Sequence, residues 1–107
     1  MADDRIRGHL EALVLAVLAR GPAHGYAIAR QLSEATDQVL NIPEGSLYPA
    51  LHRLEAAALV TSAWDETASR RRRQYAISAS GKETLVEERA RWREFRSSID
   101  AVMEGNA

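Results

Sequence analysis

The chain has 107 residues, a hydrophobic share of 46% and a formal net charge of −1, which fits one small globular domain with a modest core. It contains no cysteine, so a disulfide framework, thiolate catalysis and cysteine-based zinc sites are excluded. No apolar run approaches the roughly 18 residues of a membrane span, and the acidic start lacks the pattern of a secretory leader, so we expect a cytoplasmic protein.

Two helices are predicted in the first third of the chain. The first is indicated by apolar residues at helical spacing, namely Leu10, Leu13, Val14, Val17 and Leu18. It should end at Gly21-Pro22. The stretch "AHGYAIARQLSEATD" predicts a shorter amphipathic helix, with Ile28 and Leu32 on its buried face. Its start is poorly capped, because neither alanine nor histidine is a preferred N-cap residue.

A third helix is predicted around "GSLYPALHRLE". Its apolar stripe comprises Leu47, Leu51, Leu54 and Ala58. Asn41 followed three residues later by Glu44 resembles a capping box and favours an early start, although Ser46 is an alternative cap. With the early start, Pro49 lies inside the helix, where it removes a hydrogen bond and bends the axis.

The side of this helix opposite the leucines carries small residues with a few polar ones among them. Small side chains let a helix approach DNA closely, arginine and histidine can donate to guanine, and serine or tyrosine can reach phosphate. We therefore expect DNA contacts from Ser46, Tyr48, Pro49, His52 and Arg53. The spacing leaves open the alternative of a solvated face whose arginine pairs with an acidic neighbour.

An antiparallel hairpin is predicted next, because "LVTSAW" and "RRRQYAIS" read as short strands joined by "DETASRRR". Residues 61–84 hold five basic and three acidic groups, a local charge of +2. Because strand residues alternate faces, not all four arginines can point at DNA. Arg70 and Arg71 lie nearest the tip, so we rank them as phosphate contacts above Arg72 and Arg73. The alternative is a charged loop that protects an exposed strand edge from aggregation.

A long polar helix from Ser80 to about Met103 closes the chain. Leu85, Trp92 and Ile99 are seven apart, and Phe95 and Val102 follow three later, as in a short heptad seam that Glu88 interrupts. A helix this polar has little to pack on within one subunit. The seam therefore predicts a second subunit related by a twofold axis. The expected dimer interface comprises Leu10, Leu13, Leu85, Trp92, Phe95 and Ile99.

The order of elements defines the expected fold, which is mainly α with a small β-hairpin. Three helices and a hairpin match a winged helix-turn-helix, in which the third helix enters the major groove and the hairpin flanks it. We expect this DNA-binding domain over residues 1–79 and a C-terminal dimerisation helix over residues 80–107.

Three stretches, "HGYAIARQL", "GSLYPALHRLEAAALV" and "RRRQYAISASGKE", together resemble the PadR family of winged helix-turn-helix transcriptional regulators, in its short form with one C-terminal helix. The resemblance runs from about Leu10 to Phe95, and "LYP" followed by "LHRLE" is its most specific piece. It implies a dimeric DNA-binding protein, usually a repressor, with the residues expected above facing DNA. Ala68-Ser69 stands where members often have a glycine pair, which leaves the shape of the wing tip open.

The resemblance also implies that the first and last helices form the dimer interface. Some members bind small aromatic or drug-like molecules between subunits, beside a tryptophan of the last helix. Trp92 would take that place, and a plain interface anchor is the alternative.

No cofactor, metal or catalytic site is expected. The three histidines, His9, His24 and His52, lie far apart without the i, i+4 spacing of a helical zinc site. There is no glycine-rich phosphate loop and no nucleophile elbow. We therefore do not expect an enzyme.

The sequence thus predicts a homodimeric regulator, in particular a repressor of a palindromic operator that a small effector releases. Two alternatives stay open. A winged-helix protein-interaction module would need an exposed apolar face on the third helix. A small-molecule-binding dimer without DNA function would leave the arginine run without a role.

Overall fold

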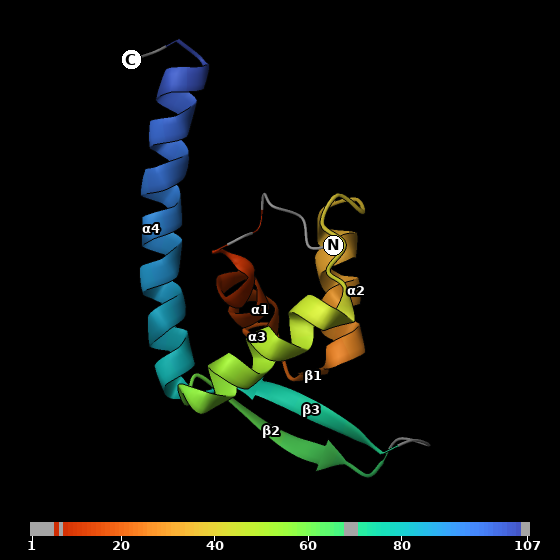
Figure 1. Ribbon diagram of the computed structural model, residues 1–107. Helices are drawn as coiled ribbons and strands as arrows, with labels where there is room; N and C mark the ends of the chain where they lie inside the picture. The colour runs from red at the N-terminus through yellow and green to blue at the C-terminus, as the bar shows by residue number, and fades with distance from the viewer. Residues whose placement is uncertain (1–5, 7, 68–70, 106–107) are drawn as a thin grey trace.

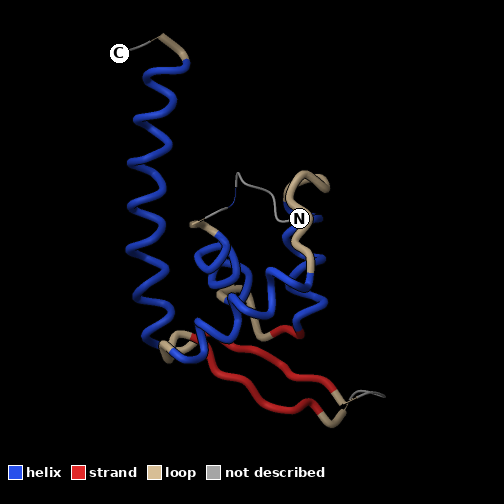
Figure 2. The backbone as a smooth tube through the Cα atoms, viewed as in Figure 1, coloured by secondary structure: helices blue, strands red, loops and turns tan. Residues whose placement is uncertain are grey.

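The computed structural model describes residue 6, residues 8–67 and residues 71–105, and it is mainly α with a small sheet, as predicted (Figures 1 and 2). The elements in chain order are α1 (Leu10–Leu18), β1 (Ala23–His24), α2 (Gly25–Ala35), α3 (Glu44–Ala56), β2 (Val60–Asp65), β3 (Arg72–Ile77) and α4 (Ala79–Met103). Figure 1 shows α1, α2 and α3 gathered beside the sheet, while α4 rises along this group and extends beyond it.

The core lies between the first three helices and the inner face of the sheet. Its most deeply buried side chains are Val14, Leu15, Leu18, Ile28, Leu47, Leu51 and Val60. The predicted leucine stripe of α3 is therefore confirmed, and Ala50 is buried beside it. Ala58 does not belong to the stripe, because it is exposed and lies beyond the end of the helix.

The start of α3 differs from the expected capping box. The helix begins at Glu44 after Pro43, and no side chain caps it. Asn41 instead accepts a hydrogen bond from Ser33 Oγ at 2.9 Å and donates one to the Gln38 carbonyl at 2.7 Å. The predicted capping box was therefore wrong, because Asn41 closes the loop after α2 instead of capping α3. The helix nevertheless begins before Ser46, the alternative cap. Pro49 does lie inside the helix, as predicted.

The end of α3 is a Schellman-type turn built on alanine instead of glycine. Ala58 adopts a left-handed φ of +61°. Its amide donates to the Glu55 carbonyl, and the Leu59 amide donates to the Leu54 carbonyl, both at 3.0 Å. This turn reverses the chain and leads it directly into β2.

The predicted hairpin is confirmed as β2 and β3, which pair antiparallel from Val60↔Ile77 to Asp65↔Arg72. Sequence reasoning missed β1, whose two residues pair with β3 to give the order β1-β3-β2. Two residues are too few to show the alternation that predicts a strand. The tip of the hairpin, including Ala68, Ser69 and Arg70, lies outside the described residues.

The long helix α4 begins at Ala79, one residue before the expected start. Its N-cap Ser78 accepts a hydrogen bond from the Gly81 amide at 3.0 Å and donates one to the Ala58 carbonyl at 2.7 Å. Leu85 enters the core, and nearly all residues after it are exposed. None of the described helices is both long and apolar enough to cross a bilayer.

Candidate nucleic-acid interface

The surface of α3 opposite the leucines forms a narrow outward stripe. At about 100° per residue, Gly45, Pro49, His52 and Ala56 fall on one side of the helix, and all four are exposed. Only His52 among them carries a hydrogen-bonding side chain. This outward stripe could approach a duplex closely and present one imidazole to the base edges.

Tyr48 lies on one flank of the stripe and was expected to point away from the core. The structure contradicts this, because Tyr48 is half-buried and packs against the core. Its ring covers Gly25 at the start of α2, so closely that a Cβ at position 25 would lie 2.6 Å from the Tyr48 hydroxyl oxygen. The missing side chain of Gly25 makes this room, which helical periodicity within α3 cannot reveal.

Arg53 lies on the other flank, toward α1. Its Nε is 3.4 Å from Glu11 Oε1, although both side chains are largely exposed. In the single chain, Arg53 is therefore paired with an acidic neighbour, which is the alternative that the sequence left open for this helix face. Ser46, seven residues earlier, is half-buried on the same flank.

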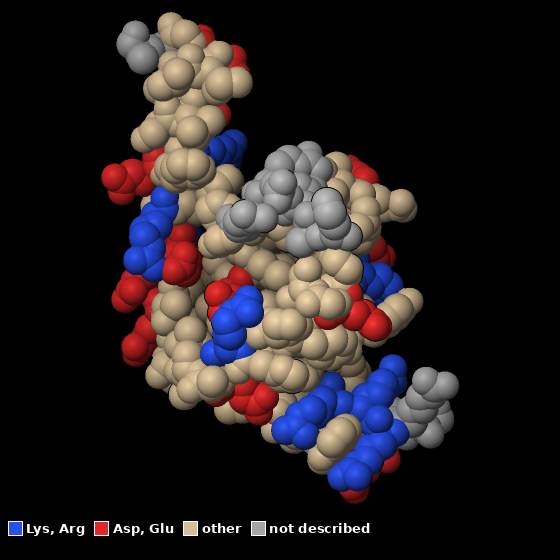
Figure 3. Space-filling view, viewed as in Figure 1, with Lys and Arg blue, Asp and Glu red and all other residues tan. Residues whose placement is uncertain are grey.

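Basic side chains gather on the β2–β3 hairpin, the wing, beside α3 (Figure 3). Arg71 and Arg72 are exposed, whereas Arg70 lies outside the described residues. The guanidinium carbons of Arg71 and Arg73 lie 4.3 Å and 4.9 Å from the ring centroid of Trp64. Arg72 projects from the opposite face of β3, because strand residues alternate. The cluster is thus divided between two faces of the wing.

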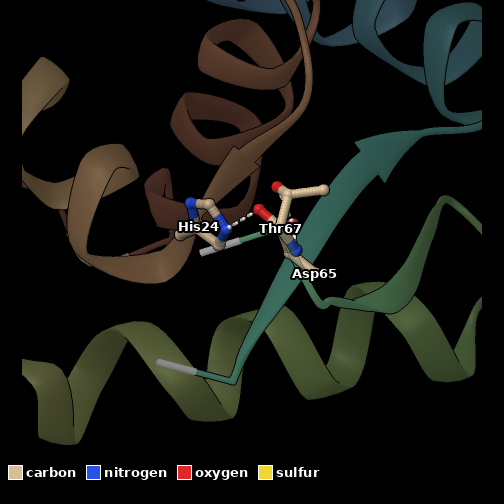
Figure 4. Close-up of polar contacts among 3 residues, drawn as sticks. All are labelled: His24, Asp65 and Thr67. Atoms are coloured by element: carbon tan, nitrogen blue, oxygen red, sulfur yellow. Dashed lines mark hydrogen bonds and ion pairs between the residues drawn. The ribbon is translucent and has the colours of Figure 1, made fainter. Parts of the chain in front are cut away.

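His24 ties the start of α2 to the wing, a contact that sequence reasoning did not anticipate (Figure 4). Its Nε2 lies 2.9 Å from Asp65 Oδ2. Asp65 Oδ1 also accepts from the Thr67 hydroxyl at 2.6 Å and from the Thr67 amide at 3.0 Å. These hydrogen bonds, that of the Thr67 hydroxyl first, hold the pKa of Asp65 below its ordinary value. The contact anchors the end of β2 that lies nearest the tip of the wing.

The heptad seam of α4 is divided by the fold. Leu85 is only 3% exposed and belongs to the core of one chain, so its assignment to a subunit interface was wrong. Trp92, Phe95 and Ile99 remain 48%, 51% and 45% exposed. Leu10 and Leu13 are half-buried against the same core.

A groove of about 510 Å³ runs between α1 and α4. Its lining includes Leu13, Leu85, Trp92 and Phe95, and the His9 ring lies 5.4 Å from that of Trp92. Among the described residues, no three histidine or carboxylate side chains come together in a way that could hold a metal ion.

An exposed helix beside a basic two-stranded wing, carried on a three-helix core, is the architecture of a winged helix-turn-helix protein. The sequence model of the transcriptional regulator PadR-like family matches residues 14–87. The chain belongs to this family and is a transcriptional regulator, as its sequence motifs predicted. Such regulators generally bind DNA and are generally not enzymes.

Similar proteins cover most of the chain. An uncharacterised protein of Lysinibacillus sphaericus is 33% identical over 104 residues, which are 96% of this chain and 95% of that protein. A transcriptional regulator of Mycobacterium tuberculosis is 36% identical over 66 residues, 62% of this chain and 59% of its own length.

Solved structures confirm the fold. A transcriptional regulator from Clostridium thermocellum superposes with a TM-score of 0.85 at 30% identity, covering 92% of this chain and 96% of that one. A PadR family regulator from Eggerthella lenta gives a TM-score of 0.81 at 34% identity, covering 94% of this chain and 87% of that one.

Proposed function

We propose that this regulator is a homodimeric repressor that acts in the cytoplasm on a palindromic DNA operator. The observation that carries the proposal is the position of the outward stripe of α3 beside the arginines of the wing (Figures 1 and 3). One duplex could meet both, with the helix in the major groove and the wing on the neighbouring backbone.

The side chains divide into two chemical roles. His52, at the centre of the stripe, can donate to a base edge, while Pro49 beside it permits close approach. Arg71 and Arg72 supply charge for phosphates, and Arg70 stays a predicted contact. Ser46 and Arg53 lie on one flank, where their polar groups would reach phosphate. Arg53 would then exchange Glu11 for the duplex.

A second copy of the chain explains the exposed part of α4. Trp92, Phe95 and Ile99 form an apolar stripe at seam spacing, and about half of each side chain is exposed in one chain. Two such helices packed about a twofold axis would bury the stripe, with Leu10 and Leu13 of α1 at its edge. The twofold axis would place two copies of α3 on successive major grooves, and the operator would share that symmetry.

A small aromatic effector is proposed for the groove between α1 and α4. Its volume of about 510 Å³ lies within the range of about 300–1,000 Å³ common for ligand pockets, and Trp92 lines it. A ligand bound there would release DNA only if it prefers a dimer in which the two DNA-binding heads are misaligned.

An electrophoretic mobility shift with the DNA that precedes the gene tests the proposal. We expect a discrete complex that survives excess unrelated duplex, and analytical ultracentrifugation should give a dimer at micromolar concentration. Failure to bind any duplex would favour the small-molecule-binding dimer, although the wing arginines would then have no role. A protein-interaction module finds little support, because the outward stripe offers no large apolar side chain.

A further inference from the structure

We propose that a wing network of five side chains runs from α3 to the wing and holds one arginine in position to contact DNA. Its members, in order from the helix outward, are Glu55, Ser62, Arg73, Trp64 and Arg71. The network assigns different roles to neighbouring arginines that look equivalent in the sequence. The DNA contact rests on the proposed function, whereas the network is a property of the free protein.

The first half of the network fastens the wing to the last turn of α3. Ser62 Oγ on β2 donates to Glu55 Oε2 at 2.5 Å, and Arg73 Nε on β3 donates to Ser62 Oγ at 3.1 Å. Arg73 Nη2 also lies 3.9 Å from Glu55 Oε2. One carboxylate of α3 is therefore connected to both strands of the wing.

The second half extends this anchorage toward the tip. Trp64 lies opposite Arg73 in the strand register, and its ring is contacted by two guanidinium groups. The carbon of Arg73 is 4.9 Å from the ring centroid and that of Arg71 is 4.3 Å away. Trp64 is 47% exposed, which is unusual for so large an apolar ring unless it has a partner or a task. The two guanidinium groups are its partners, and holding Arg71 is the task that we infer for it.

These contacts assign different roles to the two arginines, of which one positions the wing and the other is free to contact DNA. Arg73 directs its guanidinium toward Ser62 and Glu55, so we infer that it positions the wing and does not contact DNA. Arg71 is the exposed end of the network, where its stacked guanidinium keeps its N–H donors available to phosphate. Arg72 lies outside the network, on the other face of the strand.

A double-mutant cycle on DNA affinity tests the coupling. Trp64→Ala keeps every charge of the wing, yet we expect it to weaken binding about two- to fivefold, the scale of an exposed cation–π contact. In the Arg71→Ala background the same change should have little further effect, because Trp64 acts through Arg71. The matched cycle uses Arg72→Ala, in which the two losses should multiply. If the losses from Trp64→Ala and Arg71→Ala also multiply, Trp64 does not act through Arg71 and the proposed coupling is overturned.

Whether Glu55→Ala weakens or strengthens DNA binding distinguishes a positioning role of Glu55 from a purely electrostatic effect of its charge. Glu55→Ala removes a negative charge near DNA, which by charge alone should tighten binding. The wing network predicts the opposite, a several-fold weaker complex, because Arg73 and the wing lose their anchor. The control Glu66→Ala removes an exposed carboxylate of the wing outside the network and should tighten binding. Tighter binding by Glu55→Ala would overturn the positioning role.

Measurements on the free protein distinguish failure of the network from failure of the proposed function. A guanidinium stacked on an indole shifts the NMR signals of the arginine δ-methylene upfield through the ring current. We expect this shift for Arg71, and we expect Trp64→Ala to abolish it while the far-ultraviolet circular dichroism spectrum, which reports helix content, stays unchanged. An unshifted Arg71 overturns the network even if the protein binds DNA. A shifted Arg71 in a protein that binds no duplex preserves the network but overturns its proposed task.

Discussion

The ring of Tyr48 in α3 covers Gly25 at the start of α2, and it fits there because position 25 carries no side chain. A Cβ built at position 25 would lie 2.6 Å from the Tyr48 hydroxyl oxygen and 2.8 Å from its Cζ. The two residues come from "HGY" and "LYP", the two most specific motifs in the sequence. Their contact sets how closely the two helices of the helix-turn-helix unit approach each other.

This contact gives the first prediction. Gly25→Ala should lower the free energy of unfolding by about 1–3 kcal/mol, as overpacking does, because the half-buried Tyr48 ring must move. The control is Gly45→Ala, where no atom lies within 4 Å of the added Cβ. That helical exchange should raise stability by about 0.5–1 kcal/mol. Urea denaturation measures both, and equal stability of Gly25→Ala and wild type would show that the ring yields freely.

The second prediction concerns Gly81, at the start of α4. A Cβ there would lie 2.2 Å from the Leu59 carbonyl oxygen, a backbone atom that also accepts a hydrogen bond from the Ser78 amide. Backbone yields less than a side chain, so Gly81→Ala should destabilise the fold at or above the upper end of about 1–3 kcal/mol. Ser80→Ala, one residue earlier and exposed, is the control and should change stability little. A Gly81→Ala protein that melts like this control would contradict the close packing.

The third prediction is a pH dependence at Asp65, the end of β2 nearest the tip of the wing. Hydrogen bonds, first from the Thr67 hydroxyl and then from its amide, hold the pKa of Asp65 below its ordinary value of 3.8, and His24 adds to them. A carboxyl group whose pKa falls on folding contributes stability above its unfolded pKa, and this contribution is lost as the pH falls through the folded pKa. The stability difference between wild type and Asp65→Asn should therefore shrink as the pH falls below about 4.

Thermal melts between pH 2 and pH 7 would measure this difference. Thr67→Val removes the hydroxyl that is the largest single cause of the lowered pKa and should itself reduce the pH dependence. A difference between wild type and Asp65→Asn that stays constant down to pH 2 would contradict the assignment.

The fourth prediction distinguishes the centre of the outward stripe from its flank. If His52 meets a base, His52→Ala should lose about 1–3 kcal/mol of discrimination at one base pair per half-site. Arg53→Ala on the flank should weaken binding to all sequences alike and reduce the log–log salt slope by up to about 0.9 per subunit. Fluorescence anisotropy at several salt concentrations, with operator and substituted duplexes, measures both effects. If Arg53→Ala binds DNA normally but melts at a lower temperature, the role of Arg53 is only to pair with Glu11 and stabilise the fold.

The fifth prediction concerns assembly through α4. Trp92→Ala should weaken the dimer by about 2 kcal/mol or more, as expected for a tryptophan at an interface hot spot. The matched change Val86→Ala removes a side chain that is 65% exposed on the same helix and lies off the seam. It should leave the dimer constant unchanged. Sedimentation at a series of concentrations gives the constants, and a monomeric wild type at micromolar concentration would contradict both the dimer and the palindromic operator.

The sequence by itself determined the four helices and the two strands of the wing, although not the two-residue β1, and it determined the buried faces of the first three helices. The leucines of α3 and the alternation around Tyr75 report burial directly, because an element that packs on one side must repeat its apolar residues with its own period. The family motifs then identified the winged helix-turn-helix. Helix ends were less certain, since Asn41 had a capping spacing but hydrogen-bonds to Ser33 and Gln38 instead.

Only the tertiary structure decided how polar and aromatic side chains at the edges of these faces are used. Arg53 pairs with Glu11, Tyr48 covers Gly25, and His24 reaches Asp65 across 41 residues of sequence. Leu85 likewise belongs to the core of one chain although its heptad position suggested an interface. Periodicity describes one element at a time, whereas each of these contacts depends on the distance and angle between two elements. Those quantities are fixed by the packing of the whole core, so no local pattern in the sequence contains them.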